Sequence, residues 1–352
     1  MPFGQPDMTT DVYRFGQPDI DARLVGAGCG HATAAARDSS AQLDRLTSIN
    51  LDDLFDAAGL MRLRHTPLQR LLWPAARRFA DVAAEFDKLV GEQGLAFGSS
   101  WLAQRMAAGT QVTGGEHVPA TGPAVILANH PGMTDTVALL SSLASRPDLR
   151  VIAQDNPFLR ALPNVARHLI LVPDHAVGRT GALRAGLQHL RRGGALLTFP
   201  AGAIEPDPAT FGRSGALESL LHWSDSLVLL ARRVPQTRFV PALVSNVISP
   251  QAQGHVLTLL RGTAYDRQRL AAVLQVAMRR YQQMVARVAF GPAQVAHAMP
   301  VDSLRSAIIR EMRDLIEASA GAAETCPAPE RFAREPQLRP GQCPRMPRVL
   351  SP

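Results

Sequence analysis

Lysine is almost absent from this sequence: Lys88 is the only one, although lysine and arginine together number 37 among the 352 residues. The positive charge is therefore carried almost entirely by arginine, and the formal net charge is +7 at pH 7. Such a charge favours an acidic partner, namely nucleic acid, anionic lipid or a phosphorylated substrate. We attribute the excess of arginine itself to the codon usage of a GC-rich genome rather than to selection for bidentate phosphate contacts.

Cysteine is also scarce, and Cys29, Cys326 and Cys343 form no C-x-x-C pair. An odd, scattered set of cysteines argues against a disulfide framework and is typical of a protein in a reducing cytoplasm. The N-terminal segment does not combine basic residues, an apolar stretch and a small-residue cleavage site, so we expect no signal peptide. These absences predict a cytoplasmic protein.

Long hydrophobic runs are missing too. No stretch approaches eighteen consecutive apolar residues, so we expect no membrane-spanning helix, and any membrane contact must be made from the surface. Aromatic residues make up only 5% of the chain, the arginines are dispersed, and no helix-turn-helix or zinc pattern occurs. We therefore predict that nucleic acid is not a partner.

Composition and hydrophobic periodicity divide the chain into four parts. Residues 1–48 lack sustained periodicity, and residues 321–352 are rich in proline and arginine, so both are predicted to be disordered tails. Residues 49–110 have a helical pattern, in which Pro67 and Pro74 can each open a helix. Residues 111–320 alternate short apolar runs with helical patterns, which indicates an α/β layer architecture. The strands predicted there are 125–128, 151–153, 169–172, 195–199, 239–244, 255–260 and 288–295, and the longest predicted helix is 266–285.

A basic amphipathic stretch lies within the helical N-terminal region. Arginines at 62, 64, 70, 77 and 78 alternate with leucines and Trp73. A stretch of this composition can lie in a lipid interface as a membrane-surface anchor. It can equally be a helix that packs its apolar stripe on the main domain, and the sequence leaves both interpretations open.

One pair of residues is suited to proton transfer. In VILANHPGMTD, His130 directly follows a predicted buried strand, and Asp135 stands five residues later, where a helix should begin. Loops beyond the strand ends build the ligand crevice of open α/β sheets. A histidine paired there with a carboxylate is a candidate general base whose tautomer and orientation are fixed by its partner.

The spacing alone is weak, because His297 and Asp302 repeat it. That second pair has an ordinary explanation: His297 ends a strand, and Asp302 caps the last helix. Only the first pair is followed by a strand that ends in a proline-glycine turn, LLTFPAG, which contains Phe199, Pro200 and Gly202.

With these motifs in order, residues from about 112 to 320 resemble the glycerolipid acyltransferase family, which includes lysophosphatidic acid and glycerol-3-phosphate acyltransferases. The first motif of that family, N-H-x-x-x-x-D, is matched by Asn129, His130 and Asp135. Its third motif, F-P-E-G-T-R, is partly matched by Phe199, Pro200 and Gly202. The fourth, a strand with a proline, is matched at 239–241. The resemblance implies a mixed sheet flanked by helices, here with an N-terminal helical extension.

The departures from the family pattern concern the acceptor site. Ala201, Ala203 and Ile204 replace the Glu, Thr and Arg of the third motif. In the second motif, which usually offers an arginine for substrate phosphate, His175 stands near that place with Arg179 close by. Branches resembling ornithine-lipid acyltransferases also have F-P-A-G. The dyad is therefore expected to be intact, whereas the headgroup site is altered.

The resemblance implies acyl transfer from acyl-CoA or acyl carrier protein, as co-substrate, to a hydroxyl of a lysophospholipid or a related glycerolipid or aminolipid, with no cofactor and no metal. His130 would act as the base and Asp135 would orient it. Arg179 and Arg213 are candidates for an anionic headgroup or the donor phosphates, although surface arginines are usually only solvated. Gly202 would let the backbone approach substrate or would simply form a turn.

We expect the protein to lie peripherally on the inner face of the cell membrane, in contact with anionic lipids. An alternative is a catalytically impaired family member that binds lipid or a partner protein, and the altered third motif motivates it.

Overall fold

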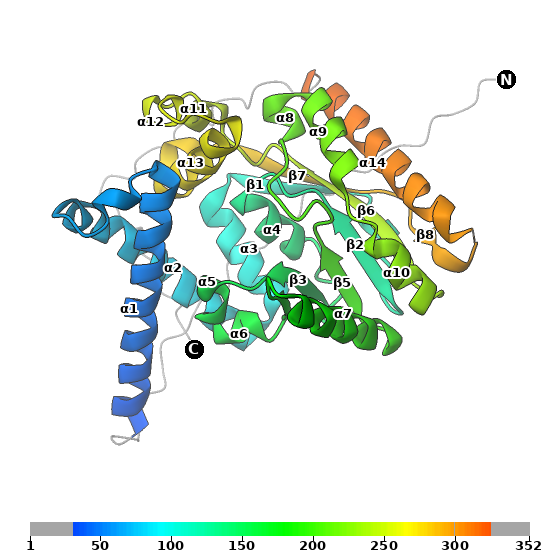
Figure 1. Ribbon diagram of the computed structural model, residues 1–352, viewed down its shortest axis with the longest axis horizontal. Coiled ribbons are helices and arrows are strands. Elements are labelled where there is room, and N and C mark those ends of the chain that lie inside the picture. Colours follow the sequence, from blue (N-terminus) through cyan, green and yellow to red (C-terminus); the bar gives the residue numbers. More distant parts are fainter. Residues whose placement is uncertain (1–30, 299, 325–352) are drawn as a thin grey trace, which may run out of the picture.

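The computed structural model describes residues 31–298 and 300–324. Within this part of the chain, eight strands form one mixed sheet in the order β1-β7-β6-β2-β5-β3-β4, and β8 pairs with β6 beside β7 (Figure 1). The strands are β1 (Gly109–Thr113), β2 (Ala124–Ala128), β3 (Arg150–Gln154), β4 (Leu169–Val172), β5 (Ala195–Thr198), β6 (Arg238–Ser245), β7 (Val285–Phe290) and β8 (Gln294–Val295).

Five neighbouring strands are parallel, namely β6, β2, β5, β3 and β4. The register aligns the end of β2 with β6, since Ala128 lies opposite Ala242. β7 runs antiparallel to β6 and pairs in parallel with β1. The carboxyl ends of the five parallel strands therefore meet at one edge of the sheet, where ligand sites of such folds are built.

Helices cover both faces of this sheet. The longer ones are α1 (His31–Ala58), α2 (Leu68–Gln93), α3 (Leu95–Met106), α4 (Met133–Ser141), α7 (Ala176–Arg191), α9 (Arg213–Ser219), α10 (Ser226–Arg233), α13 (Ala264–Ala277) and α14 (Val301–Glu324). Single turns are α5 (Pro157–Arg160), α6 (Pro163–Ala166), α8 (Pro208–Phe211), α11 (Pro250–Gln253) and α12 (Val256–Leu259), with 3-10 turns η1 (Met61–Leu63), η2 (Gly115–His117), η3 (Leu220–His222), η4 (Arg279–Tyr281) and η5 (Ala296–Ala298).

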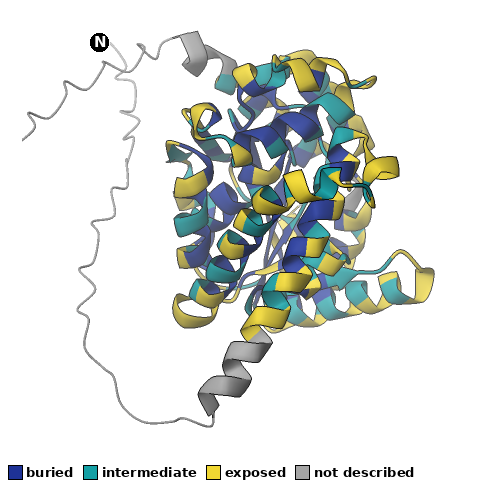
Figure 2. Cartoon of the chain, turned by 90° about the vertical axis from the view of Figure 1, so that its left-hand side faces the viewer, coloured by how far each residue is buried: buried dark blue, intermediate teal, exposed yellow. Residues whose placement is uncertain are grey.

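The two cores follow from the alternation of side chains along the central strands. Every residue of β2 is buried. Ala124, Ile126 and Ala128 pack under α2, α4 and α13, whereas Val125 and Leu127 pack under α7, α10 and α14. Because successive strand residues point to opposite faces, a continuous apolar run is required where both faces are covered. Figure 2 shows the buried sheet enclosed by helices whose outer faces are exposed.

The N-terminal helices are attached to this domain on one side. Helix α2 buries the stripe formed by Ala76, Ala80, Ala83, Phe86 and Val90. The buried Asp87 carboxylate accepts hydrogen bonds from the backbone N–H groups of Asn164 and Val165, at 2.9 Å each. Helix α2 therefore packs its apolar stripe on the main domain, and the start of the helix stays outside, with Leu71 and Trp73 exposed.

The predicted fold class, a mixed sheet flanked by helices with an N-terminal helical extension, is confirmed. Several sequence predictions are wrong in detail. Residues 31–48, predicted as part of a disordered tail, lie in α1, because Leu46 and the following turns pack on α2 and the domain. Residues 321–324 likewise continue α14. The remainder of both predicted tails, and with it all three cysteines, lies outside the described residues.

Other errors concern element type and length. Residues 255–260, predicted as a strand, contain the helical turn α12. Pro74 does not open a helix but lies within α2, which begins at Leu68. The predicted helix 266–285 ends at Ala277, and β7 already begins at Val285. No helix within the described residues is both long and apolar enough to cross a membrane.

The largest fully buried side chain is that of an arginine, Arg146. Its guanidinium donates to the carbonyl oxygens of Pro119, Gly122 and Gly193 at 2.9 to 3.1 Å, and it pairs with Asp148 at 2.8 Å. It thus joins the segments that precede β2, β3 and β5. A buried charge is tolerated only when hydrogen bonds and an opposite charge surround it in this way.

Replacing Arg146 with Met should lower the free energy of unfolding by about 2–4 kcal/mol, because the buried carbonyl groups lose their donors. Urea denaturation measures this loss. Arg184→Met, on the exposed face of α7, is the matched control and should change the stability by less than about 0.5 kcal/mol. Equal stability of the two variants would contradict a structural role for Arg146.

Candidate active site

The candidate site begins at the end of the central strand β2. The Asn129 side chain donates to the carbonyl oxygen of Val244 at 2.9 Å and accepts the backbone N–H of Val244 at 2.7 Å. The buried amide thus continues the pairing of β2 with β6 by one residue. The following residue, His130, is thereby placed at a fixed point above the carboxyl edge of the sheet.

His130 and Asp135 are in direct contact. The Nδ1 atom of His130 lies 2.7 Å from Oδ2 of Asp135, whose side chain is fully buried, whereas the His130 side chain is 31% exposed. Since Nδ1 is engaged by the carboxylate, Nε2 is the ring nitrogen that can accept a proton. The contact expected from the H-x-x-x-x-D spacing is therefore present.

The Asp135 carboxylate is held by the start of helix α4. Its Oδ2 atom accepts the backbone N–H of Gly132 at 3.1 Å, and its Oδ1 atom accepts both the backbone N–H and, at 3.1 Å, the hydroxyl of Thr136. Asp135 stands in the first turn of α4, where the helix dipole favours negative charge. The carboxylate therefore cannot turn away from the imidazole without losing these bonds.

The surroundings of His130 increase its basicity. Burial by itself lowers the pKa of the imidazole, but the Asp135 carboxylate, by charge and hydrogen bond, and then Glu205 outweigh this effect, so the pKa is raised above the usual 6.5. The Phe199 ring packs against the imidazole, with ring centroids 4.6 Å apart. The third motif, which directly follows β5, therefore lies beside the imidazole of the first motif.

A second carboxylate, Glu205, lies under the His130 loop and was not among the predicted site residues. Its backbone N–H donates to the carbonyl oxygen of His130 at 2.8 Å, and its Oε2 atom accepts the backbone N–H of His130 at 3.0 Å. Its Oε1 atom accepts the Ser219 hydroxyl and the Trp223 indole N–H, at 2.9 Å each. Burial raises the pKa of Glu205 above its usual 4.5, although these donors and His130 oppose the shift.

Two further buried side chains hold the same loops together. Gln268 of α13 donates to the carbonyl oxygens of Pro131, at 2.7 Å, and Glu205, at 2.8 Å. The Asp207 carboxylate accepts backbone N–H groups from the segment after β6, including that of Val247 at 2.7 Å. The loops that follow β2, β5 and β6 are therefore one hydrogen-bonded unit.

The remaining residues of the third motif form a turn. Pro200 is buried, and the Gly202 N–H donates to the carbonyl oxygen of Phe199 at 3.0 Å. Gly202 has a φ of 65° and is exposed, with open space where a side chain would begin. The left-handed conformation accounts for glycine here, and the open space leaves room for close approach of a ligand. Ala203 is exposed as well.

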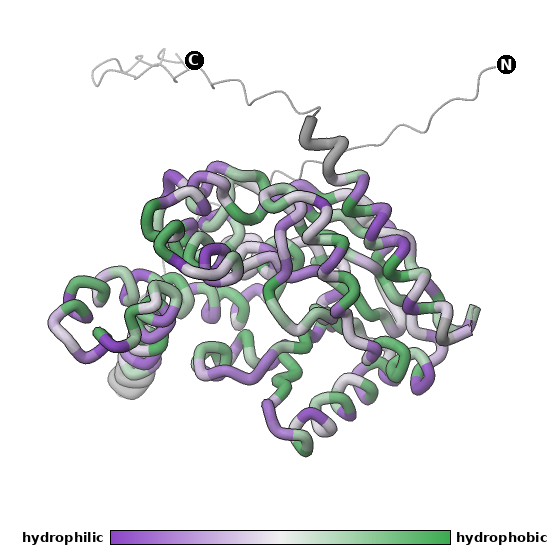
Figure 3. Tube along the Cα trace, turned by 45° about the horizontal axis from the view of Figure 1, so that its top comes forward, coloured by the Kyte–Doolittle hydropathy of each residue, from purple (hydrophilic) through white to green (hydrophobic). Residues whose placement is uncertain are grey.

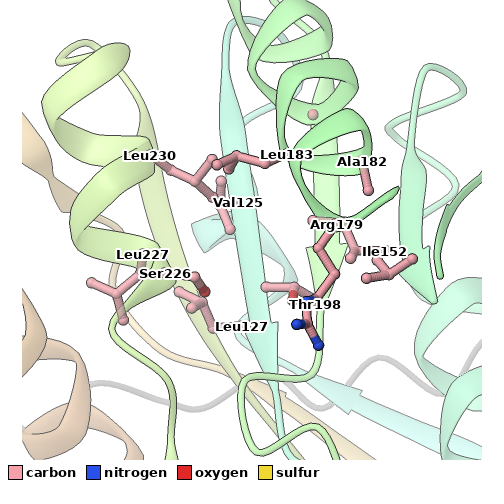
Figure 4. A pocket seen from close by; sticks show the side chains of 12 residues that line it. Val125, Leu127, Ile152, Arg179, Ala182, Leu183, Thr198, Ser226, Leu227 and Leu230 are labelled. Atoms are coloured by element: carbon pink, nitrogen blue, oxygen red, sulfur yellow. The ribbon is translucent and has the colours of Figure 1, made fainter. Parts of the chain in front are cut away.

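Arg179 lies at a different place, on the opposite face of the sheet from the α4 helix. It lines a cavity of about 140 Å³ between α7 and α10, over β2 and β5. Figure 4 shows its side chain near Thr198, the residue before Phe199. The lining is mostly apolar, with Arg179, Thr198 and Ser226 as its polar groups. The predicted site residue thus borders a cavity that adjoins the third motif.

The other arginine and histidine named from the sequence lie at the surface. Arg213 is exposed at the first position of α9, and His175 is exposed just before α7. The repeated spacing at His297 does not form a second site of this kind: His297 is exposed, and its Nδ1 atom faces the carbonyl oxygen of Pro235 at 3.3 Å. Among the described residues, no group of three or more His, Cys, Asp or Glu could hold a metal ion.

Glu205 could have been noticed from the sequence only by its position. It follows F-P-A-G in I-E-P-D-P, four residues after Ala201, which occupies the place of the family's glutamate. No periodicity marks a residue in such a loop as buried. Only the folded turn at 199–202 brings its carboxylate back under His130.

One of three comparisons with known proteins bears on the motif analysis. A family model described as Acyltransferase matches residues 109–245. Among solved structures, the 1-acyl-sn-glycerophosphate (LPA) acyltransferase PlsC from Thermotoga maritima is similar at 15% sequence identity and a TM-score of 0.41, covering 81% of this chain and 97% of that chain. No curated protein matches the sequence significantly.

Replacing Glu205 with Ala should lower the free energy of unfolding by about 1–3 kcal/mol, because the buried Trp223 indole N–H and two partly buried donors, the Ser219 hydroxyl and the His130 N–H, lose their acceptor. Thermal or urea unfolding checks this loss. Glu218→Ala, an exposed glutamate one residue before Ser219, is the control and should be nearly neutral. A Glu205→Ala protein as stable as the control would show that the loop does not depend on this carboxylate.

Proposed function

We propose that the protein transfers a fatty acyl group from an acyl thioester to a hydroxyl of a lysophospholipid or a related glycerolipid or aminolipid, since a family model described as Acyltransferase matches residues 109–245. The observation that carries this proposal is the His130–Asp135 contact of 2.7 Å at the carboxyl edge of the sheet. His130 is the general base, and Asp135 fixes its orientation and tautomer.

The reaction requires one proton transfer in each direction. Nε2 of His130 takes the proton of the acceptor hydroxyl as the oxygen attacks the thioester carbonyl. The Asp135 carboxylate stabilises the imidazolium that forms, and Glu205 adds a second negative charge nearby. When the carbon–sulfur bond breaks, the thiolate takes the proton from His130 and leaves as a thiol. The products are the ester and the free thiol, so no cofactor and no covalent enzyme intermediate is needed.

The two substrates make different demands on the site. The donor is acyl-CoA or acyl carrier protein, and assays with each distinguish them. Arg179 and Arg213 are the candidate ligands for phosphate groups of donor or acceptor. The apolar cavity next to Arg179 is suited to an aliphatic chain, because its lining is mostly Val, Leu, Ile and Ala side chains.

A second candidate function is lipid or protein binding without catalysis, which the replacements at Ala201, Ala203 and Ile204 favour. Glu205 weakens this alternative, because a carboxylate is still present under His130 although Ala201 lacks one. Thioester release in the presence of candidate acceptors separates the two functions. A binding module would give no turnover above that of the His130→Ala variant.

We further propose that the protein docks peripherally on the inner face of the cell membrane through the start of α2. Arg70 and Arg78 of α2 are exposed, together with Leu71 and Trp73, and so is Arg62 in the preceding turn η1. Arg64 and Arg77 of the same stretch instead pair with Asp52 and Asp44 of α1 at the surface. The first three arginines are therefore the ones available to anionic lipid.

His130→Ala should lower the rate of acyl transfer by at least about 100-fold, because no other group replaces the base. The unfolding transition should shift little, since Gly132 and Thr136 still satisfy the Asp135 carboxylate. His297→Ala, which has the same spacing to an aspartate, is the matched control and should keep full activity. Wild-type activity of the His130→Ala variant would exclude this mechanism.

The triple substitution of Arg62, Arg70 and Arg78 by Gln should weaken binding to vesicles that contain phosphatidylglycerol, by about 10-fold or more at low salt, since each arginine near an anionic surface contributes about 1 kcal/mol. Co-sedimentation measures the bound fraction. The control removes equal charge from α7 and the residue that follows it (Arg184, Arg191 and Arg192 to Gln). If both variants bound equally well, the N-terminal segment would not be the contact.

A further inference from the structure

The turn α12 has its polar and apolar side chains in the reverse of the usual arrangement. Thr258 is completely buried, and its hydroxyl lies within hydrogen-bond distance of two carbonyl oxygens, that of Gln253 at the end of α11, at 2.6 Å, and that of His255 just before α12, at 2.5 Å. The apolar residues around it point outward: Val256 is 68% exposed, Leu257 49%, Leu259 58% and Leu260 76%. In water, exposing this much apolar surface on one turn is unfavourable.

This exposed turn is rigidly attached. Ala252 of the preceding turn α11 is fully buried, and the Ser249 backbone N–H donates to the Gln275 side chain of α13 at 2.8 Å. On the other side, the Arg267 side chain donates to the carbonyl oxygen of Arg261 at 2.9 Å. The leucines are therefore held outward by the packing around them, and the turn cannot simply rotate to bury them.

The α12 turn lies beside the N-terminal segment, although the two are far apart in sequence. The Arg261 guanidinium occupies the space next to Gly59, at the end of α1, and Arg269 of α13 pairs with Asp56 at 2.5 Å. Figures 1 and 3 both show α11 and α12 near the end of α1 and the segment that follows it. Leu60, Met61 and Leu63 of that segment are exposed as well.

The surface thus contains two exposed apolar segments, 60–63 and 256–260, with arginines between and beside them. We propose that α12 inserts its leucines into the interfacial region of an anionic lipid bilayer, as a second contact next to the start of α2. Exposed aliphatic side chains flanked by arginine are the combination that partitions into such an interface. Arg62 is exposed, whereas Arg261 pairs with Asp266 at 3.4 Å. A second copy of this chain is the alternative occupant that the test below distinguishes.

This contact deepens the proposed function by orienting the reaction site. Helix α13 follows α12 directly, and its Gln268 holds the carbonyl oxygens of Pro131 and Glu205. The membrane contact and the His130 loop are therefore joined through one helix. A lipid acceptor could reach His130 from the bilayer to which α12 is docked.

The test compares two double variants that carry the same chemical change. Leu259→Gln with Leu260→Gln removes the proposed contact, and Leu221→Gln with Leu229→Gln changes exposed leucines of η3 and α10. Binding is measured by co-sedimentation with vesicles of phosphatidylglycerol and phosphatidylethanolamine. The Leu259→Gln, Leu260→Gln variant should bind at least about 10-fold more weakly than the wild type, and this loss should persist at high salt. The Leu221→Gln, Leu229→Gln variant should bind like the wild type.

Equal binding by both double variants would overturn the proposal. So would a change in oligomeric state, measured by analytical ultracentrifugation, that accompanied Leu259→Gln with Leu260→Gln while vesicle binding stayed the same, because the surface would then belong to a second copy. The His130→Ala protein should bind the same vesicles like the wild type. This binding readout needs no turnover, so failure of the docking surface and failure of the acyltransferase proposal are distinguishable.

Discussion

Two hydrogen bonds in opposite directions join the backbone of His130 to Glu205, and the geometry of the whole site depends on them. They tie the loop after β2 to the loop after β5, at the point where neighbouring parallel strands end. Gln268 then joins both loops to α13, and Asp207 joins the second loop to the segment after β6. Without these bonds, Asp135 could still orient the imidazole, but the pair would not be fixed relative to Phe199 and the sheet.

The same unit sets the electrostatics of His130. The partly buried imidazole of His130, near two carboxylates, has its pKa raised above the usual value because the nearby negative charges outweigh the cost of burial. Asp135 makes the direct contact, and Glu205 acts through space while remaining bound to three donors. An enzyme that forms an imidazolium during the reaction benefits from this arrangement, since the negative charges are already in place.

Much of the fold could be predicted from the sequence because its signals are local. The fully buried strand β2 is a continuous apolar run, and the His130–Asp135 contact lies within six residues of chain, so neither depends on distant packing. The predictions are wrong where contacts between residues far apart in the sequence determine the secondary structure. Residues 255–260 are predicted as a strand, but they contain the turn α12, whose apolar side chains point outward around a buried Thr258. Residues 31–48 looked too irregular for a helix, but packing on α2 stabilises α1.

The site residues that could be predicted are likewise those with a local sequence signal. Motif spacing located His130, Asp135 and Phe199, which the fold brings together. Glu205 stands in a proline-containing loop with no periodicity. Its side chain is held by His130, in the loop after β2, and by Ser219 and Trp223, in the segment from the end of α9 through η3. The sequence therefore shows that Ala201 lacks the carboxylate of the family motif, but it does not show that the Glu205 carboxylate lies under the His130 loop.

The central claim is that neutral His130, made more basic by Asp135, removes the proton from the acceptor hydroxyl. The most direct test is the pH dependence of the acyl-transfer rate at saturating donor, in the wild type and in Asp135→Asn. Our account predicts that the wild-type rate rises with pH through an apparent pKa above 6.5, and that Asp135→Asn lowers both the maximal rate and this pKa. A rate with the same pH dependence in both proteins would contradict it.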